Sequence, residues 1–492
     1  MGEEVAATVF SRSDRQRFRA KVHTCLDVLA MMLSERQFDH DRPMIGMELE
    51  LNLVDAGGQP AMRNGDVLAA IANPDFQTEL GAFNVEVNIP PRRLAAGAFT
   101  QTENAVRSAL NDADARAREV GAEMVMIGIL PTLTPAQLTR ESLSTNSRYA
   151  LLDQQILAAR GEDLTIRIDG VERLSTHADS IAPEAACTSA QLHLQVSPDD
   201  FATYWNAAQC LAAAQVAVAA NSPYFLGKQL WTETRIALFQ QATDTRAEEL
   251  AAQGVRPRVW FGERWITTVF DLFEENTRYF PALLPVCQDE DPRTVFAAGA
   301  TPQLHELRLH NGTVYRWNRP IYAVSDNRPH LRIENRVLPS GPTVVDTCAN
   351  AAFWFGAVRS LAEAERPVWS QMSFDAAQAN FEAAARYGIE ARLYWPGLGE
   401  VPVSELMLRR LLPAARQGLA AWGVDEKESD RMLGILEGRC VEGRNGATWQ
   451  TAMVARLEFQ QGLSREAALA AMLHQYREHM HSNEPVHTWP SG

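Results

Sequence analysis

Two glutamates lie two residues apart inside an apolar stretch, IGMELELNLVD, at residues 45–55. Alternate side chains of a strand point to opposite faces, so Glu48, Glu50 and Asn52 would share one face. Two like charges on one face are unfavourable unless positive charge lies over them. Mg²⁺ would supply that charge, because it takes oxygen ligands and often shares protein carboxylates with substrate phosphates. The pattern suggests metal-assisted phosphoryl transfer.

Four more segments alternate in the same way: FNVEVNI (83–89), AQLHLQVS (190–197), QLHELRLH (303–310) and HLRIENRVL (330–338). Solvated strand faces also alternate, but they usually carry Thr, Lys, Ser and mixed charges. The polar positions here carry carboxylate, imidazole and guanidinium groups: Glu86, His193, Glu306, Arg308, His310, Arg332, Glu334 and Arg336. We therefore predict an antiparallel sheet with one face in the core and the other lining a site.

Arg332 and Arg336 suit phosphate oxygens, because a guanidinium group is planar, stays charged and donates two parallel hydrogen bonds. The glycine-rich signatures of nucleotide sites are missing from the sequence: it has no GxxxxGK[ST] loop and no GxGxxG between a strand and a helix. We expect ATP, if it binds, to be held through metal ions and arginines.

Composition narrows the class of protein. The chain has 492 residues, 46% of them hydrophobic, and a formal net charge of −15, which argues against a general nucleic-acid binder. Its six cysteines form no CxxC pair, so a structural zinc site is not expected. The sequence shows neither the apolar core of a signal peptide nor an apolar run of about 20 residues that could span a membrane. We expect a cytoplasmic protein with no membrane partner.

The order of elements predicts an α+β fold. Helical spacing marks residues 14–34, 100–121 and 203–223, interspersed with the strands above. From residue 346 onward the pattern is mostly helical. We therefore divide the chain into a helical segment at 1–41, an α+β domain at 42–345 and a helical region at 346–492.

Six segments within residues 42–345 carry a resemblance. They are, in order, GMELEL, FQTELGAFNVEVNIPP, TSAQLHLQVS, ANSPYFLGKQLWTETRIALFQQ, LRLHNGTVYRWNRP and PHLRIENRVLPSGPT. They resemble the motifs of the bacterial carboxylate–amine ligases of the glutamate–cysteine ligase type. The resemblance implies a fold related to glutamine synthetase, with an antiparallel sheet curved into a funnel around ATP and metal. It also implies that residues 42–345 form the catalytic domain.

The same resemblance implies an ATP-dependent reaction in which glutamate becomes γ-glutamyl phosphate and an amine, cysteine in the simplest case, then forms the amide. It implies Mg²⁺ or Mn²⁺ as the metal. Arg336 corresponds to the contact with the transferring phosphate and Arg235 to the arginine that binds the substrate carboxylate. Arg332, Arg316 and Arg319 are expected nucleotide contacts. The implied metal ligands are Glu48, Glu50, Glu79, Glu86, His193 and Glu334.

Three other readings stay open at this point. The first keeps the chemistry with a different amine or carboxylate. The second is a nucleotide-binding relative that lacks turnover. The third is an α+β protein whose polar strand faces are merely solvated, and it predicts that Glu50→Gln barely alters metal affinity. The sequence specifies neither the amine acceptor nor the oligomeric state.

Overall fold

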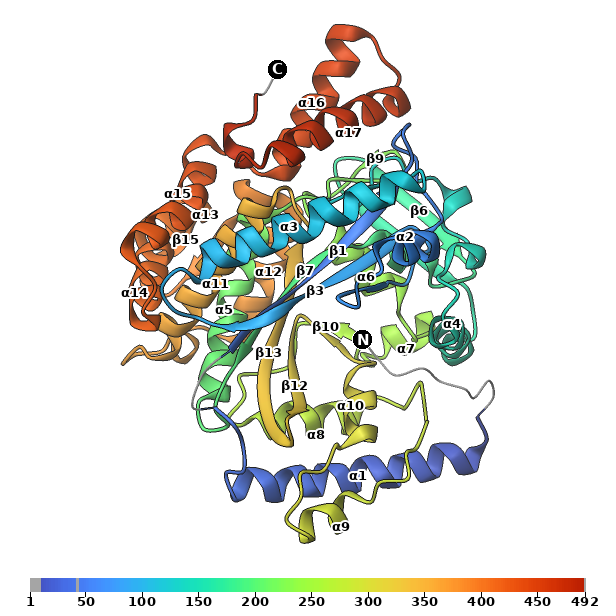
Figure 1. Cartoon of the computed structure of the whole chain (residues 1–492), viewed down its shortest axis with the longest axis vertical. Coiled ribbons are helices and arrows are strands. Elements are labelled where there is room, and N and C mark those ends of the chain that lie inside the picture. The colour runs from blue at the N-terminus through green and yellow to red at the C-terminus, as the bar shows by residue number, and fades with distance from the viewer. Residues whose placement is uncertain (1–9, 41–43, 491–492) are drawn as a thin grey trace.

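The computed structural model describes residues 10–40 and 44–490. Its centre is a seven-stranded sheet in the order β12-β13-β7-β1-β3-β2, with β4 paired to the end of β1 (Figure 1). All neighbouring strands of this sheet are antiparallel. The strands are β1 (Met44–Val54), β2 (Phe76–Thr78), β3 (Asn84–Arg93), β4 (Glu123–Val125), β7 (Ser189–Gln195), β12 (Asn318–Ser325) and β13 (Arg328–Pro339).

Two irregularities bend the sheet. The register shifts between Ile45 and Met47 where β1 pairs with β3, and between Asn335 and Leu338 where β13 pairs with β7. Bulges of this kind increase local twist. The sheet curls into a half-barrel with helices beside it, so the predicted α+β class and curved antiparallel sheet are confirmed.

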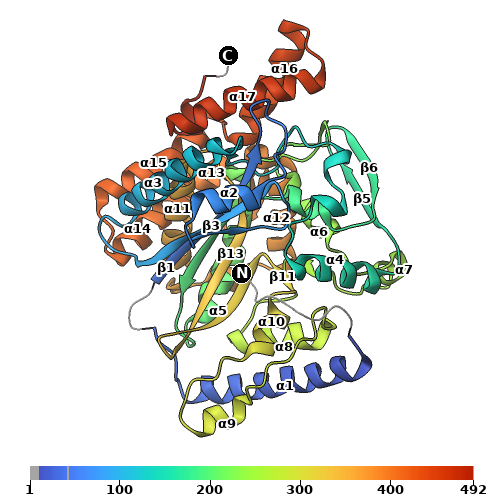
Figure 2. The same ribbon diagram turned by 45° about the vertical axis from the view of Figure 1, so that its right-hand side comes forward.

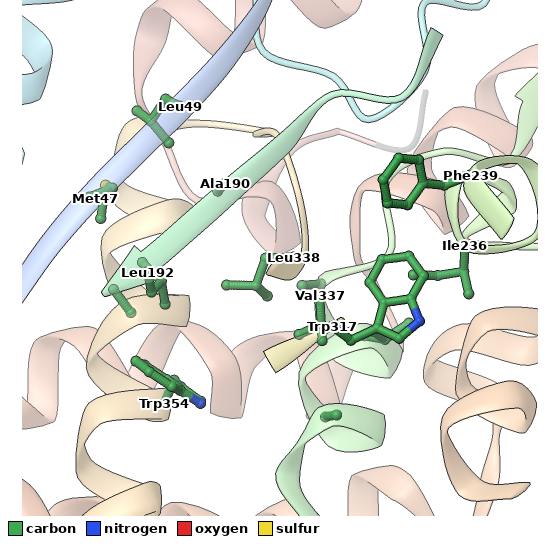
Figure 3. Packing of buried hydrophobic residues seen from close by; sticks show 14 of the residues in the cluster. Met47, Leu49, Ala190, Leu192, Ile236, Phe239, Trp317, Val337, Leu338 and Trp354 are labelled. Atoms are coloured by element: carbon green, nitrogen blue, oxygen red, sulfur yellow. The ribbon is translucent and has the colours of Figure 1, made fainter. Parts of the chain in front are cut away.

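Helices cover the apolar face of the sheet. α5 (Phe201–Ala219) is buried on nearly every side, because it lies between the sheet and the helices α11 (Val344–Ala362) and α12 (Phe374–Tyr387). Figure 3 shows Leu192 of β7 next to Trp354 of α11, with Met47 and Leu49 on the neighbouring strand β1 in the same hydrophobic cluster. α3 (Ala98–Glu119) packs beside α11.

A second group of helices lies on the polar side of the sheet. α8 (Val269–Tyr279), α9 (Pro292–Ala297) and α10 (His305–Asn311) pack on α1 (Arg12–Ser34), with α8 and α10 above α1 and α9 below it in Figures 1 and 2. α4 (Ser147–Arg160) stands beside this group. The smaller elements are α2 (Asn64–Ile71), β5 (Leu164–Asp169), β6 (Arg173–Ala178), β8 (Tyr224–Phe225), β9 (Lys228–Gln229), α6 (Thr234–Ala242), α7 (Glu248–Ala252), β10 (Val259–Trp260) and β11 (Tyr315–Arg316).

One predicted strand is wrong, because residues 303–310 form helix α10. The segment QLHELRLH satisfies both periods: Leu304, the residue just before the helix, and Leu307 within it are three residues apart, and both are buried. Glu306 is also buried, and its Oε1 lies 3.3 Å from Lys21 Nζ of α1. The polar residues of this segment therefore face two ways. Glu306 pairs with Lys21 of α1, and Arg308 faces the sheet.

The predicted helices at 14–34, 100–121 and 203–223 are confirmed as α1, α3 and α5. The helical C-terminal region is also present, and a short hairpin of β14 (Arg392–Trp395) and β15 (Gly399–Pro402) interrupts it. Its helices, besides α11 and α12, are α13 (Val403–Leu406), α14 (Leu412–Trp422), α15 (Glu426–Glu442), α16 (Gly446–Gln461) and α17 (Arg465–Ser482).

The division into three regions stays a prediction. One hydrophobic cluster runs from Phe18 to Trp489 and includes residues of all three. A fully buried ion pair, Asp346 Oδ1 to Arg439 Nη2 at 2.8 Å, ties the start of α11 to α15. Residues 1–9, 41–43 and 491–492 of the predicted regions lie outside the described chain. No helix within residues 10–40 and 44–490 is long and apolar enough to cross a membrane.

Candidate active site

Strand register brings the predicted metal ligands into two groups. Glu50 of β1 lies opposite Glu86 of β3, and His193 of β7 lies opposite Glu334 of β13. In each group, three side chains offer one ligand atom apiece, and these atoms lie within 4.8 Å of one another. The first cluster is Glu48, His193 and Glu334, and the second cluster is Glu50, Glu79 and Glu86.

Basic groups surround the first cluster. Nη2 of Arg319 donates to Glu334 Oε1 at 3.0 Å, and Nε of Arg332 donates to His193 Nδ1 at 3.1 Å. Burial alone would raise the pKa of Glu48, but the attraction of His193 outweighs it and lowers the pKa to about 2. Burial likewise opposes ionisation of Glu334, yet Arg319 and Arg336 hold its pKa well below the ordinary value. Both carboxylates are therefore ionised at neutral pH.

His193 supplies a test of whether a metal ion fits. Its buried Nε2 lies 2.9 Å from Glu48 Oε1, and this contact contributes to the low pKa of that acid. Two carboxylates and an imidazole nitrogen whose ligand atoms lie within 4.8 Å of one another suit a divalent cation, which would take the place of the proton between Nε2 and Glu48. Ligation through Nε2 requires the proton on Nδ1, so Arg332 would then have to release that nitrogen.

The second cluster contains no basic residue. Glu50 is 5% exposed and accepts hydrogen bonds from Ser189 N at 2.6 Å and Gln191 Nε2 at 2.7 Å. Burial, with repulsion from Glu48 and Glu50, raises the pKa of Glu86 to about 8. Burial, with repulsion from Glu50 and Glu86, raises the pKa of Glu79 well above its usual value. Three buried carboxylates this close are unfavourable when ionised, and a bound cation would remove the cost.

Arg336 lies between the two clusters. Its Nη1 is 3.4 Å from Glu334 Oε2 of the first cluster and donates to Gln191 Oε1, whose amide also holds Glu50 of the second. Burial opposes the charge of Arg336, but Glu334 and Glu50 outweigh it and raise the pKa of the guanidinium. The group therefore stays charged and is aligned by both clusters.

A cavity of about 330 Å³ lies over these residues. Its wall combines sheet residues with residues of the helices on the polar side, such as Phe273 of α8 and Arg308 of α10. The site residues in its lining are Glu48, Glu79, Glu86, Arg319, Arg332, Glu334 and Arg336. A smaller space of about 60 Å³, which we call the inner chamber, shares the lining residues Glu79, Leu80, Glu184 and Arg336 with this cavity.

Arg235 and Arg316 have different positions. Arg235 of α6 lines the inner chamber, with Nε 3.0 Å from Glu233 Oε1. Arg316 is turned away from both spaces, since its neighbours Tyr315 and Trp317 occupy the sides that face them. It is 1% exposed, and its Nη2 donates to Glu275 Oε2 at 2.9 Å. We therefore remove Arg316 from the expected nucleotide contacts.

Glu184 and Gln191 face the cavity but were not among the residues predicted from the sequence. Glu184 lies in a short helical turn, Ala182–Ala186, just before β7, and burial raises its pKa to about 8. The available signal was a lone acid in the apolar segment IAPEAAC. Gln191 shares the polar face of β7 with His193, so strand alternation alone would have included it.

The antiparallel half-barrel carries two carboxylate clusters and arginines on one face, and the family to which the sequence matches makes the protein a carboxylate–amine ligase. The family model "Glutamate-cysteine ligase family 2" (GCS2) matches residues 44–474. The chain belongs to this family.

Two solved structures share the fold. A glutamate–cysteine ligase from Francisella tularensis, solved in complex with AMP, is 11% identical with a TM-score of 0.55, and the match covers 91% of each chain. A bifunctional glutathione synthetase from Pasteurella multocida is 12% identical with a TM-score of 0.52, and the match covers 94% of this chain and 55% of that one. No curated protein matches the chain by sequence.

Proposed function

We propose that the protein is an ATP-dependent ligase that joins the γ-carboxylate of glutamate to an amine through γ-glutamyl phosphate, with cysteine as the first amine to test. The observation that carries the proposal is the pair of three-ligand clusters beneath one cavity, with Arg336 between them. Phosphoryl transfer depends mainly on positioning and on charge stabilisation, and this arrangement offers both.

The residues divide into three roles. Glu48, His193 and Glu334 would hold one divalent ion, and Glu50, Glu79 and Glu86 a second. Bound Mg²⁺ or Mn²⁺ would neutralise the carboxylates and the phosphate oxygens together. Arg319 and Arg332 line the same cavity and would bind phosphate oxygens of ATP.

Arg336 would act on the transferring group itself. Its guanidinium lines both the cavity and the inner chamber, so it can contact a phosphoryl group at their junction. Charge that develops on the phosphate oxygens as the γ-carboxylate attacks would be stabilised by a donor already in place. Arg235 would bind the carboxylate of the substrate that does not react. We place this reaction in the cytoplasm.

The experiment is ADP release by the purified full chain with ATP, Mg²⁺, L-glutamate and each amine of a panel, with products identified by mass spectrometry. Glutamate labelled with ¹⁸O in its carboxylates should transfer one labelled oxygen to inorganic phosphate if an acyl phosphate forms. Cysteine-dependent ADP release with a γ-glutamylcysteine mass is the expected result. A different amide keeps the chemistry and changes the acceptor, whereas ATP binding without ADP release from any mixture would contradict the proposal.

A further inference from the structure

A separate cavity, which we call the α1 cavity, lies between α1 and the pair α8 and α10. Its volume is about 70 Å³. It shares no lining residue with the inner chamber or with the cavity of about 330 Å³ over the sheet, which we call the main cavity. Its lining residues are Arg15, Phe18, Arg19, Val22, Thr277, Phe280, Pro281, Ala282 and His310. The four from α1 recur at helical spacing and therefore share one face of that helix.

The lining of the α1 cavity is positively charged. It contains two arginines and no acid among the described residues. Arg15 donates to two neutral oxygens, Ala282 O at 3.1 Å and Gln155 Oε1 at 2.7 Å. Arg19 is exposed, and no carboxylate of the described chain forms an ion pair with it. Two guanidinium groups without a countercharge favour an anion, and their planar donors suit a carboxylate.

His310 adds an acceptor without a partner to the same lining. It is 4% exposed, and its Nε2 lies 2.9 Å from the carbonyl oxygen of Asn276. Because a carbonyl oxygen only accepts, Nε2 carries the proton. Burial lowers the pKa of the imidazole to about 4, so Nδ1 keeps its lone pair at neutral pH. Nδ1 makes no hydrogen bond with any described residue, which is unfavourable unless a ligand donates to it.

The remaining wall of the cavity is largely apolar. Phe18 and Val22 of α1 are buried, as is Phe280 directly after α8. The ring centroids of Phe18 and His310 lie 6.4 Å apart. A short alkyl group would be removed from water against these side chains, a gain that a bare phosphate or sulfate ion could not make.

The helices α8 and α10 separate the α1 cavity from the main cavity. α8 places Phe273 in the main cavity and Thr277, about one turn later, in the α1 cavity. α10 places Arg308 in the main cavity and His310 in the α1 cavity. A ligand in the α1 cavity would therefore contact the reverse side of this wall and would not compete with ligands of the main cavity.

We propose that the α1 cavity binds a small hydroxycarboxylate with a short alkyl group, at a second site distinct from the proposed catalytic one. Arg15 and Arg19 would bind the carboxylate, and the hydroxyl would donate to His310 Nδ1. A hydroxyl fits better than an ammonium group, because an ammonium group would add positive charge beside two arginines where the described lining has no acid.

Ligand-observed NMR on the full chain tests the proposal without turnover. MgCl₂, a non-hydrolysable ATP analogue and L-glutamate first occupy the main cavity. The main probe is α-hydroxyisovalerate. Its matched analogues are isovalerate, which lacks the hydroxyl, α-hydroxyisovaleramide, which lacks the charge, valine, which replaces the hydroxyl by an ammonium group, and inorganic phosphate, which lacks the alkyl group.

We expect α-hydroxyisovalerate to bind roughly 5- to 10-fold more tightly than isovalerate, the value of one hydrogen bond to a buried acceptor. It should bind at least about 10-fold more tightly than the amide, because charge-assisted hydrogen bonds are the stronger ones. Valine and phosphate should also bind more weakly than the hydroxycarboxylate.

Three variants locate the binding. Arg19→Gln, at an exposed position, should weaken α-hydroxyisovalerate about 5-fold or more and leave the amide unchanged. Ala282→Leu extends a half-buried side chain of the lining into the cavity and should abolish binding. Arg12→Gln is the matched control, since it removes an exposed arginine of α1 outside the lining and should change nothing. Thermal unfolding shows whether each variant is folded.

Three results would overturn the inference. The first is a wild type that binds α-hydroxyisovalerate no more tightly than isovalerate and the amide. The second is binding that persists unchanged in folded Arg19→Gln and Ala282→Leu variants. The third is valine or phosphate binding as tight as that of the hydroxycarboxylate. Failure of the ligase proposal would appear instead in the ADP-release experiment, which none of these binding measurements requires.

Discussion

The two carboxylate clusters lie on the same sheet face but differ in how their charge is balanced. In the first cluster, Arg319 binds Glu334 and His193 lies against Glu48, so the pKa values of both acids are lowered. In the second cluster, no basic residue is a member, and the pKa values of Glu79 and Glu86 are raised. Glu48 and Glu334 are therefore ionised without a metal, whereas burial and mutual repulsion favour the protonated forms of Glu79 and Glu86 until a cation binds.

This difference determines whether each cluster needs a metal ion to balance its negative charge. A compensated cluster can be formed before any ligand arrives, because its charges are already paired. An uncompensated one exchanges protons for metal, so its affinity for metal depends on pH. We expect the second cluster to respond more strongly to substitution, pH and metal removal.

The largest effect should come from Glu86→Gln or Glu50→Gln. Either change removes a ligand of the second cluster, and we expect kcat to fall by at least about 10²- to 10³-fold, since charge stabilisation of several kcal/mol is lost. Above pH 8, where Glu86 loses its proton, Glu86→Gln should also raise the melting temperature of the metal-free protein, because it removes like-charge repulsion. Steady-state ADP release and thermal unfolding measure the two effects. Turnover near the wild-type rate would exclude this cluster from the metal site.

Arg336→Lys tests the group that joins the clusters. Lysine cannot reproduce a planar fork that faces Glu334 and Gln191 together, so we expect kcat to fall about 10²-fold with a smaller change in KM. Arg366→Lys at an exposed position is the matched control and should leave both constants unchanged. An Arg336→Lys enzyme with an unaltered rate would place the transferring phosphate elsewhere.

The pH dependence should separate the clusters directly. The folded pKa of Glu86 is about 8 against an ordinary value of 4.5, so the folded state holds this proton more tightly than the unfolded chain. Its contribution to stability is complete below pH 4.5 and is lost as pH rises through 8. We expect the metal-free melting temperature to fall across this window and Mg²⁺ affinity to rise across it.

Differential scanning calorimetry with and without Mg²⁺ checks this prediction. Mg²⁺ should stabilise the protein more at pH 8 than at pH 6, and Glu86→Gln should flatten both trends. A melting temperature that rises over the same window in the metal-free protein would contradict the assigned cause.

The smallest effect on activity should come from Arg316→Lys. This side chain lies outside both spaces and binds Glu275 and Asn276, so its replacement should lower stability by about 1–3 kcal/mol and change kcat less than threefold. Denaturant unfolding and ADP release measure the two. A large loss of kcat in a stably folded variant would return Arg316 to the site.

The sequence alone determined which side chains share a strand face. Alternation in IGMELELNLVD and HLRIENRVL is a local property of the backbone, so Glu48 and Glu50 could be placed on one face of their strand, and Arg332, Glu334 and Arg336 on one face of theirs. The helices α1, α3 and α5 were predictable for the same reason. The quoted motifs also indicated the family, to which the match over residues 44–474 assigns the chain.

Only the tertiary structure decided how those faces meet. Alternation says nothing about partner strand or register, and register is what divides six ligands into two clusters by setting Glu50 opposite Glu86 and His193 opposite Glu334. Packing decided the conformation of α10 and the position of Arg316. α10 is a helix because its leucines meet α1 and the core. Arg316 lies outside the site because it pairs with Glu275. Glu184 enters the site because its turn is held beside the sheet. Periodicity along the chain cannot encode such contacts, which join residues far apart in sequence.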